Sequence, residues 1–371
     1  MPTIAEKAEY KLIETFATDK KLQEQKGIIP EILHSRELNW GEILEQCIRN
    51  KILPLAAQIL TGLEYRNSIP KFVLLHLESS LDQNRIKTEL FRNAALEVGR
   101  TLLSEKISFV VTKGIVFESI LYGGNGSRSM NDIDFMILPA DREKVRSVMK
   151  GLGYFEGIFD WNAGEVKPHN RKDKIIYELN PDHLPIFAKL TGENLIRCVH
   201  VDFANSLTWE KSEFNVPVES AMEENFFYSL PGSGSFPMPC FGIPYQFIFT
   251  ILHFFREAWL ERWMSWEQDV NLIKFFDVMR LWDLYKNELI RKDFTDLLRI
   301  FGIEKPVAWV LVHIDRAFQS KMAEELGLGQ VVSEEFLRSS LASGGKLIYW
   351  KGDMRNRIYS KNRKDLFYPE A

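Results

Sequence analysis

Two aspartates separated by one residue, Asp132 and Asp134, are the side chains best suited to do chemistry in this chain. They stand at the start of an apolar run, 133–138, whose composition is typical of a buried strand. Because side chains alternate across a strand, residues i and i+2 share a face. Two carboxylates on one face repel each other unless a cation lies between them or water screens them. The spacing therefore predicts a cation site, and Mg²⁺, a hard ion that takes carboxylate and phosphate oxygens, is its natural occupant.

The segments before the pair predict how it is positioned. Residues 107–112 form a second apolar, β-branched run that ends at Lys113 and Gly114, and 115–122 have the apolar spacing of a short helix. The loop 123–127 is rich in glycine, which is typical of a flexible connector, and it lacks the Gly-Lys-Ser/Thr end of a P-loop. The predicted order is a strand, a Lys-Gly turn, a short helix, a loop and the strand with the aspartates.

These residues resemble the signature of the nucleotidyltransferase superfamily of the DNA polymerase beta type. The likeness is greatest to a bacterial branch in which Lys-Gly replaces the usual Gly-Ser and an arginine precedes the Asp-x-Asp. It extends over roughly residues 30–290, is specific only in the core motif, and includes a similar lead-in of helix, turn and strand over 84–114. The matching string is Lys113-Gly114 followed by Arg128-x-x-x-Asp132-Ile133-Asp134.

The resemblance implies a third carboxylate on a neighbouring strand, which would complete a site for two Mg²⁺ ions. Asp202 is the favoured candidate, because in 198–203 it alternates with apolar residues and shares a strand face with His200. Glu178, within 175–179, remains open as the alternative. We expect His200 to pack at the edge of the site, since Mg²⁺ prefers oxygen to imidazole. The predicted catalytic and metal-binding residues are thus Asp132, Asp134 and Asp202.

The resemblance also implies a nucleoside triphosphate as donor. Lys113 and Arg128 are the expected triphosphate contacts, because cations form charge-assisted bonds with phosphate. Gly114 would let backbone N–H groups at the start of the next helix approach a phosphate. Ser129 is a further candidate for phosphate binding. Binding of the nucleotide is therefore expected around the Lys-Gly turn and the residues just before the aspartates.

Two long helices are predicted over 244–285, after a Pro/Gly-rich connector at 231–240. Their aromatic residues are chiefly core. Lys274 and Asp277 have a helical spacing that puts them on one face, and the resemblance implies that this helical region lines one wall of the cleft. We therefore include Lys274 and Asp277 among the predicted nucleotide contacts.

The expected fold class is α+β, with a small mixed sheet flanked by helices on both sides in sequence. The predicted parts are an N-terminal helical unit, 1–106, a nucleotidyltransferase core, 107–215, a C-terminal helical unit, 216–343, and a basic, aromatic segment, 344–371. A helix starting near Asp141, with that residue as its cap, is expected within the core. The last segment would bind RNA through cations and stacked rings, or it would pack as a tail with buried stems and solvated charges. We favour the packed tail.

Composition places few limits on the partner. The net charge of −4 over 371 residues argues against strong whole-surface attraction to nucleic acid or membrane. The three cysteines, Cys47, Cys198 and Cys240, are far apart in sequence and are expected to be buried thiols in a reducing cytoplasm. The start of the chain lacks an apolar signal segment, and no apolar run is long enough to span a membrane. The expected location is cytoplasmic.

The sequence predicts a Mg²⁺-dependent nucleotidyltransferase that moves a nucleoside monophosphate, with AMP from ATP favoured, to an acceptor. A small molecule, a peptide, a protein or an RNA end would each serve as acceptor, because pocket shape decides that choice. Two alternatives remain open. One is a non-catalytic nucleotide-binding protein of the same fold, and the other is an RNA-binding or toxin-type module that uses the basic C-terminal segment.

Overall fold

The computed structural model describes residues 7–35, 38–209, 212–230, 236–342 and 344–369. Its backbone contacts divide the chain into two compact units. One, called here the sheet unit, consists of residues 82–249. The other, called the helical unit, is built from both ends of the chain, residues 1–81 and 250–371. Each unit has a core of its own and is described separately.

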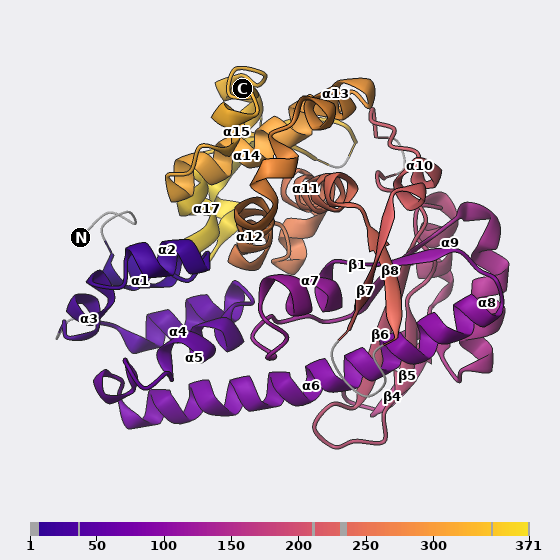
Figure 1. Cartoon of the computed structure of the whole chain (residues 1–371), viewed down its shortest axis with the longest axis horizontal. Coiled ribbons are helices and arrows are strands. Elements are labelled where there is room, and N and C mark those ends of the chain that lie inside the picture. Colours follow the sequence, from indigo (N-terminus) through magenta and orange to yellow (C-terminus); the bar gives the residue numbers. More distant parts are fainter. Residues whose placement is uncertain (1–6, 36–37, 210–211, 231–235, 343, 370–371) are drawn as a thin grey trace. The chain divides into compact units, whose positions relative to one another are not determined.

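The sheet unit contains the segments with the predicted metal-binding and phosphate-binding residues (Figure 1). Its helices are the second part of α6 (Lys71–Ser104), α7 (Lys113–Leu121), α8 (Arg142–Gly151), α9 (Arg171–Leu179), α10 (Val218–Glu223) and the start of α11 (Ile243–Trp259). Its strands are β1 (Phe109–Thr112), β2 (Ile133–Ile137), β3 (Phe155–Asp160), β4 (Glu165–Pro168), β5 (Phe187–Leu190), β6 (Cys198–Ala204), β7 (Asn225–Ser229) and β8 (Pro237–Phe241). A 3₁₀ turn, η3 (Pro139–Asp141), precedes α8.

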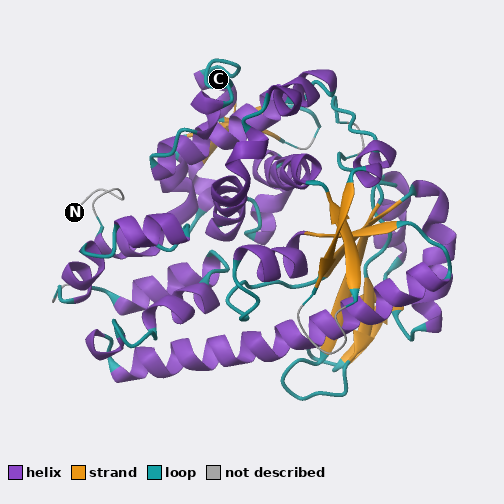
Figure 2. Ribbon diagram, viewed as in Figure 1, coloured by secondary structure: helices purple, strands orange, loops and turns teal. Residues whose placement is uncertain are grey.

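These strands form one mixed sheet in the order β4-β3-β5-β6-β2-β1-β8-β7 (Figure 2). Strands β2 and β6 are parallel neighbours, while β1 and β5 pair antiparallel with β2 and β6 respectively. The central strands β1, β2 and β6 are therefore adjacent although they come from distant parts of the sequence. The predicted α+β class with a mixed sheet is confirmed.

The two faces of this sheet differ in chemistry. One face carries a chain of aromatic contacts through Phe109, Phe135, Phe203 and Phe187, and helix α6 covers it, since a Cβ at Gly99 would meet the Phe109 ring at 3.3 Å. The register puts the alternate residues of β1, β2 and β6 on the opposite face. That second face, called here the carboxylate face, holds the polar side chains of the predicted site.

The helical unit consists mainly of α-helices. From the first part of the chain come α1 (Ala8–Glu14), α2 (Asp19–Glu24), α3 (Ile28–Leu33), α4 (Trp40–Arg49), α5 (Leu53–Leu60), η2 (Arg66–Ser68) and the start of α6. The last part adds the rest of α11, then η4 (Glu261–Trp266), α12 (Leu272–Leu289), α13 (Lys292–Ile300), α14 (Glu304–Phe318), α15 (Met322–Glu325), α16 (Glu334–Leu337), α17 (Met354–Tyr359) and η5 (Arg363–Leu366). A small sheet, in the order β11-β10-β9, joins β9 (Ser339–Leu341), β10 (Leu347–Trp350) and β11 (Phe367–Pro369).

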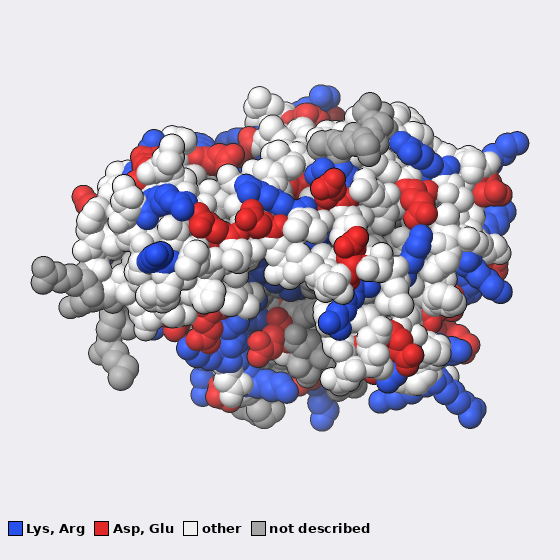
Figure 3. Space-filling view, turned by 90° about the horizontal axis from the view of Figure 1, so that it is seen from below, with Lys and Arg blue, Asp and Glu red and all other residues white. Residues whose placement is uncertain are grey.

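A fully buried ion cluster joins the C-terminal segment to this unit. Arg357 Nη2 lies 3.1 Å from Asp269 Oδ2, and Arg363 Nη1 lies 2.7 Å from Asp269 Oδ1. The Asp269 side chain is fully buried, as is that of Arg357, and that of Arg363 is nearly so. The expectation of a tail with solvated charges is thus wrong for these two arginines, because both are buried and paired with the same carboxylate inside the core. On the surface drawn in Figure 3, cationic and anionic side chains are interspersed.

Several local predictions can be compared with the structure. The long helices expected over 244–285 are confirmed as α11 and α12. Asp141 does precede α8, but its side chain makes no cap bond and pairs with Lys144 at 2.8 Å instead. The predicted connector at 231–240 lies partly outside the described residues, and its last part forms strand β8. All three cysteines are buried. None of the described helices is long and apolar enough to cross a membrane.

Candidate active site

Asp134 and Asp202 lie directly opposite each other on adjacent strands. The parallel register of β2 and β6 pairs Asp134 with Asp202, and the antiparallel register of β1 and β2 pairs Asp134 with Thr112. Opposed residues share a face, so both carboxylates are on the carboxylate face. Their side chains are partly exposed, 18% for Asp134 and 26% for Asp202. Asp132 is the residue immediately before β2.

Lys113 is placed against Asp134 by an unusual backbone conformation. It follows Thr112, the last residue of β1, and starts helix α7 with φ of +40°. A positive φ is uncommon in residues other than glycine and marks a constrained position. The Lys113 ammonium lies 3.4 Å from Asp134 Oδ1 and 4.6 Å from the centre of the Phe249 ring. The predicted triphosphate contact therefore stands beside one of the two opposed carboxylates.

Gly114 leaves space in front of that carboxylate. A Cβ built at Gly114 would stand 3.6 Å from Asp134 Oδ2 and 3.5 Å from the Asp132 carbonyl oxygen, both ordinary contact distances. Gly114 has no positive φ, so the backbone conformation does not require glycine here. What glycine provides is the absence of a side chain next to Asp134, at the first turn of α7, where backbone N–H groups have no helical partners.

The glycine-rich loop is held by side chains of two helices, in contrast to the flexible connector that its composition suggests. Asn84 donates to the carbonyl oxygens of Gly126 and Arg128, at 2.6 and 3.1 Å. The buried Glu118 accepts from the Gly126 N–H at 2.6 Å and pairs with Arg92 at 3.3 Å. Buried side chains of two helices thus fix the loop that leads to the aspartates.

The two predicted phosphate contacts after this loop differ in exposure. Arg128 is 8% exposed, with its guanidinium carbon 5.6 Å from the centre of the Phe117 ring and Nη1 donating to the Ser129 carbonyl oxygen at 3.3 Å. Ser129 is partly exposed. Contact of either side chain with phosphate remains a prediction.

His183 was not identified from the sequence. Its Nδ1 lies 3.4 Å from Asp202 Oδ2, and its Nε2 lies 3.5 Å from Asp182 Oδ2. An isolated bridge between His183 and Ala204 places it beside the end of β6. The only sequence signal was an Asp-His pair in a loop, which occurs widely, and strand alternation says nothing about loop residues. The structure therefore adds His183 and Asp182 to the surroundings of Asp202.

Glu178 and His200, the other residues considered near Asp202, are also placed. Glu178 is exposed on helix α9 and not on a neighbouring strand, where the resemblance places the third carboxylate. His200 lies on β6 two residues before Asp202, and its alternation with buried neighbours is as predicted. Burial, with Lys87 nearby, lowers the pKa of His200, which agrees with packing at the edge of the site.

Lys274 and Asp277 belong to helix α12 of the helical unit, and their role in nucleotide binding remains a prediction. Lys274 forms an ion pair with Glu257 and donates to the carbonyl oxygens of Gln268 and Asp269. Glu257 in turn lies 3.6 Å from His253 Nδ1. Lys274 therefore has a carboxylate partner, Glu257, on α11.

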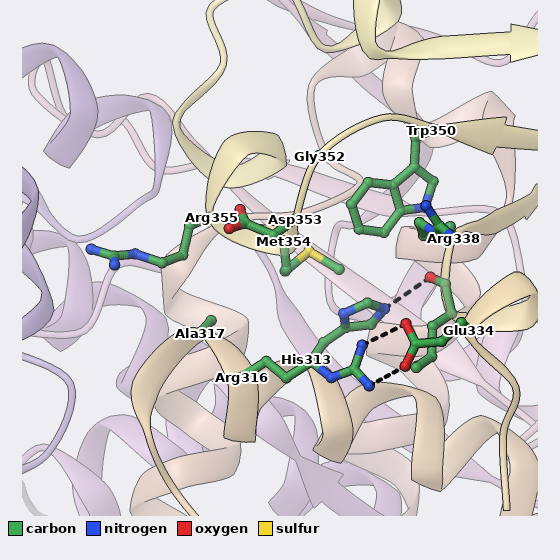
Figure 4. Close-up of a pocket in the computed structure, with 11 residues that line it drawn as sticks. His313, Arg316, Ala317, Glu334, Arg338, Trp350, Gly352, Asp353, Met354 and Arg355 are labelled. Atoms are coloured by element: carbon green, nitrogen blue, oxygen red, sulfur yellow. Dashed lines mark hydrogen bonds and ion pairs between the residues drawn. The ribbon is translucent and has the colours of Figure 1, made fainter. Parts of the chain in front are cut away.

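A cavity of about 320 Å³ lies elsewhere in the helical unit (Figure 4). Its lining includes His313 and Arg316 of α14, Glu334 of α16 and Trp350 of β10. Arg316 Nη1 donates to Glu334 Oε2 at 2.9 Å, and His313 Nε2 lies 3.0 Å from the Leu337 carbonyl oxygen. The predicted site residues do not line this cavity.

The donor set on the carboxylate face has the chemistry that Mg²⁺ requires. Asp134 and Asp202 supply carboxylate oxygens from two strands in register, and Mg²⁺ in phosphoryl-transfer sites is held by one or two carboxylates together with substrate phosphates. Among the described residues, no three histidine, cysteine, aspartate or glutamate side chains form a group arranged to hold a metal ion. Two carboxylates alone would leave the other coordination positions of such an ion to substrate phosphates and water.

The sheet unit thus brings two opposed aspartates, and a lysine at the strand-to-helix turn beside them, to one face of a mixed sheet. The chain belongs to the nucleotidyltransferase family whose model, described as an uncharacterised nucleotidyltransferase, matches residues 36–319. It is therefore a transferase, and the family resemblance seen in the motif is confirmed. No curated protein and no solved structure shows significant similarity to the chain.

Proposed function

We propose that this nucleotidyltransferase moves a nucleoside monophosphate, with AMP from ATP as the first candidate, to an acceptor held over β5 and β6. The observation that supports this most directly is the register of Asp134 with Asp202, with the Lys113 ammonium 3.4 Å from Asp134. Nucleotidyl transfer needs the attacking oxygen, the phosphorus and the leaving oxygen in line, with the developing charge neutralised. Opposed carboxylates beside a lysine meet the electrostatic part of that requirement.

Each residue has a distinct part in the proposed reaction. Lys113 binds the triphosphate, and Gly114 leaves the space through which a phosphate reaches the first turn of α7. Arg128 and Ser129 extend the phosphate site, and Lys274 and Asp277 are proposed as further nucleotide contacts. Asp132, Asp134 and Asp202 would hold two Mg²⁺ ions, which when bound activate the attacking oxygen and neutralise the leaving pyrophosphate.

Asp202 is assigned to the acceptor side of the site. Its strand neighbours β5, whereas Asp134 neighbours β1 and the Lys-Gly turn on the other side. The triphosphate, attracted to Lys113, is therefore expected on the β1 side, which leaves the β5 side of Asp202 for the acceptor. His183, 3.4 Å from Asp202 Oδ2, would fix the orientation of that carboxylate.

The proposal is tested by thermal unfolding of the wild type, Asp134→Asn and Asp202→Asn with each NTP, with and without Mg²⁺. A ligand that binds only the folded state raises the unfolding temperature by mass action. We expect a Mg²⁺-dependent rise with one NTP in the wild type and a smaller or absent rise in both variants. Asp141→Asn, which removes a carboxylate paired with a lysine elsewhere in the sheet unit, is the control and should behave as the wild type. No rise with any NTP would refute the proposal.

An RNA-binding role for the C-terminal segment gains little support from the described residues. Arg357 and Arg363 are buried with Asp269, and Arg355 pairs with Glu14 at 2.9 Å. These three guanidiniums are already engaged within the helical unit, so they are poorly placed to meet a phosphate backbone. We therefore put nucleotidyl transfer first, with RNA retained only as a class of acceptor to be tested.

A further inference from the structure

Large apolar side chains are exposed in one short stretch of the sheet unit. Of the nineteen large hydrophobic residues exposed in the described part of the chain, eight fall between residues 155 and 195. Single exposed apolar residues are ordinary, but a concentration of them marks an interaction surface. Six lie on hairpin β3–β4 and helix α9, called here the exposed segment (155–179): Phe155, Ile158, Trp161, Ile175, Ile176 and Leu179.

Helix α9 presents its apolar side away from the sheet. None of its residues is fully buried. At 3.6 residues per turn, Ile175, Ile176 and Leu179 share one side, and Tyr177 points the opposite way. The Tyr177 ring packs against His169 with centroids 5.2 Å apart, and its hydroxyl is hydrogen-bonded to the Ile186 backbone on the sheet. The apolar side therefore contributes nothing to the core of this chain.

The exposed segment continues to the carboxylate face. Phe155 pairs with Ala188 of β5, and Ala188 pairs with His200 of β6, which shares a strand face with Asp202. Phe155 is therefore on the same face of the sheet as Asp202, and its side chain is 65% exposed. Tyr177 of α9 also approaches this part of the sheet, since its hydroxyl is hydrogen-bonded to the backbone of Ile186, the residue before β5. A molecule that docks around Phe155 therefore lies over the same face of the sheet as Asp202, on the side of β6 assigned above to the acceptor.

The side chain of His169, next to helix α9, has a buried nitrogen without a hydrogen-bond partner among the described residues. His169 links β4 to α9 and is 7% exposed, and the nitrogen is its Nε2. A buried polar atom without a partner is costly and calls for an explanation such as a ligand. Its ring contact with Tyr177 places His169 against the inner side of α9.

The exposure and charge of this segment indicate which class of molecule it binds. Small-molecule sites are concave and enclose most of the ligand, whereas these six apolar side chains are 44–73% exposed. Nucleic acid and anionic membranes are bound by excess positive charge, whereas 155–179 holds four basic and five acidic residues. Apolar surface without net positive charge is typical of contacts between proteins.

We propose that the acceptor of the nucleotidyl group is a protein that docks by an apolar surface on the exposed segment and presents a hydroxyl-bearing side chain at Asp202. This inference rests on the proposed function. In the reaction, the hydroxyl oxygen bonds to the α-phosphorus of the NTP and the bond to the bridging oxygen breaks. Pyrophosphate leaves with that electron pair, and the hydroxyl proton is lost to water.

The test follows the label from each α-³²P-labelled NTP in cell extract incubated with the full-length protein and Mg²⁺. We expect labelled bands that protease removes and ribonuclease does not. Ile176→Gln with Leu179→Gln makes the outer side of α9 polar without adding charge, and should lower the rate of protein labelling by about tenfold or more, as when two apolar anchors of an interface are lost. Leu284→Gln with Ile300→Gln, which alters two exposed apolar residues on α12 and α13, is the matched control and should label as the wild type.

The outcomes separate this inference from the proposed function. Label found only in small molecules or in RNA, or protein labelling unchanged in the α9 variant, would overturn a docked protein acceptor while leaving nucleotidyl transfer intact. So would the absence of labelled protein from an enzyme that shows the Mg²⁺-dependent NTP effect on unfolding. Absence of that NTP effect would instead count against the proposed function itself. Equal NTP effects in the α9 variant and the wild type would show that the variant is folded.

Discussion

Lys113 stands 3.4 Å from Asp134, so the cation and the carboxylate neutralise each other where the proposed triphosphate must enter. The arrangement has a consequence for binding. A nucleotide with its metal ions would exchange this internal pair for two new ones, lysine with phosphate and carboxylate with metal. The pair therefore keeps both groups near their working positions without a ligand.

Replacing Lys113 should weaken NTP binding. Lys113→Ala removes a charge-assisted contact with phosphate, so we expect the dissociation constant to rise roughly ten- to hundredfold. Isothermal titration with the NTP and Mg²⁺ measures this directly. Lys106→Ala is the matched control, because Lys106 is an exposed lysine of the same unit that also has a positive φ, +58°. An unchanged affinity in Lys113→Ala would show that the triphosphate lies elsewhere.

Two glycines of the loop before the aspartates should differ in their tolerance of a side chain. Gly123 and Gly126 have nearly the same φ, +78° and +79°, but a Cβ on Gly126 would stand 2.8 Å from the Cα of Arg85. At Gly123 the nearest atom is 3.7 Å away. Each alanine costs about 1–2 kcal/mol in backbone strain, and Gly126→Ala adds roughly 1–3 kcal/mol of overpacking. The difference in unfolding free energy between the two variants, measured in urea, gives the cost of overpacking at Gly126. Equal losses of stability would contradict the close approach of Arg85 to Gly126.

The buried cluster of the helical unit should be sensitive to loss of its carboxylate. Asp269→Asn leaves Arg357 and Arg363 buried without a counter-charge, and we expect a loss of roughly 3–5 kcal/mol of unfolding free energy. Asp296→Asn, in the exposed pair with Arg299, is the control and should cost less than about 1 kcal/mol. Denaturant unfolding at neutral pH measures both. Similar losses would mean that the cluster contributes no more than a surface pair.

The same cluster predicts sensitivity to acid. Burial alone would raise the pKa of Asp269, but Arg357 and Arg363 outweigh it and hold that pKa below its usual value. A carboxylate whose pKa is lower in the folded state stabilises the fold above its unfolded-state pKa, about 4, and loses this contribution as the pH falls through the folded-state value. Unfolding free energy measured from pH 5 downward should fall for the wild type and fall less for Asp269→Asn.

His313 predicts a second, separate pH dependence. Burial lowers its pKa to about 3, so the folded protein keeps the ring neutral while the unfolded chain binds a proton near pH 6.5. Stability is then fully present above pH 6.5 and is lost as the pH falls toward 3. The slope of unfolding free energy against pH reports how many more protons the unfolded chain binds than the folded protein. We expect His313→Gln to lower this number by up to one in this pH range. His76→Gln, at an exposed histidine of α6, should leave the slope unchanged.

The sequence was sufficient to predict the positions of residues that alternate along a strand. The alternation of apolar and polar residues in 198–203 predicted which side of the strand Asp202 occupies, and the register of β2 and β6 then brought it opposite Asp134. The segment 175–179, which supplied Glu178 as the alternative, could not be assigned from its sequence. So short a segment fits a strand or a helix equally well, and here it belongs to helix α9.

Contacts between distant parts of the chain could not be predicted. Asp269 is 88 residues from Arg357, and His183 meets Asp202 through a loop whose path no periodicity describes. The basic residues after Gly344 therefore resembled a solvated tail in sequence, although Arg357 and Arg363 belong to the core of the helical unit. A single sequence contains no signal for such pairings unless they repeat at a fixed spacing.

The helical unit is assembled from both ends of the chain, and this sets the order in which the protein is completed during synthesis. Glu14 pairs with Arg355, the ring of Tyr10 stacks on that of Tyr359 at 4.0 Å, and Gln46 donates to the Tyr359 carbonyl oxygen. During synthesis, α1 and α4 therefore emerge more than 300 residues ahead of these partners, while all of 82–249 emerges in between. A nascent chain arrested before α17 would hold a complete sheet unit beside helices that still lack these partners.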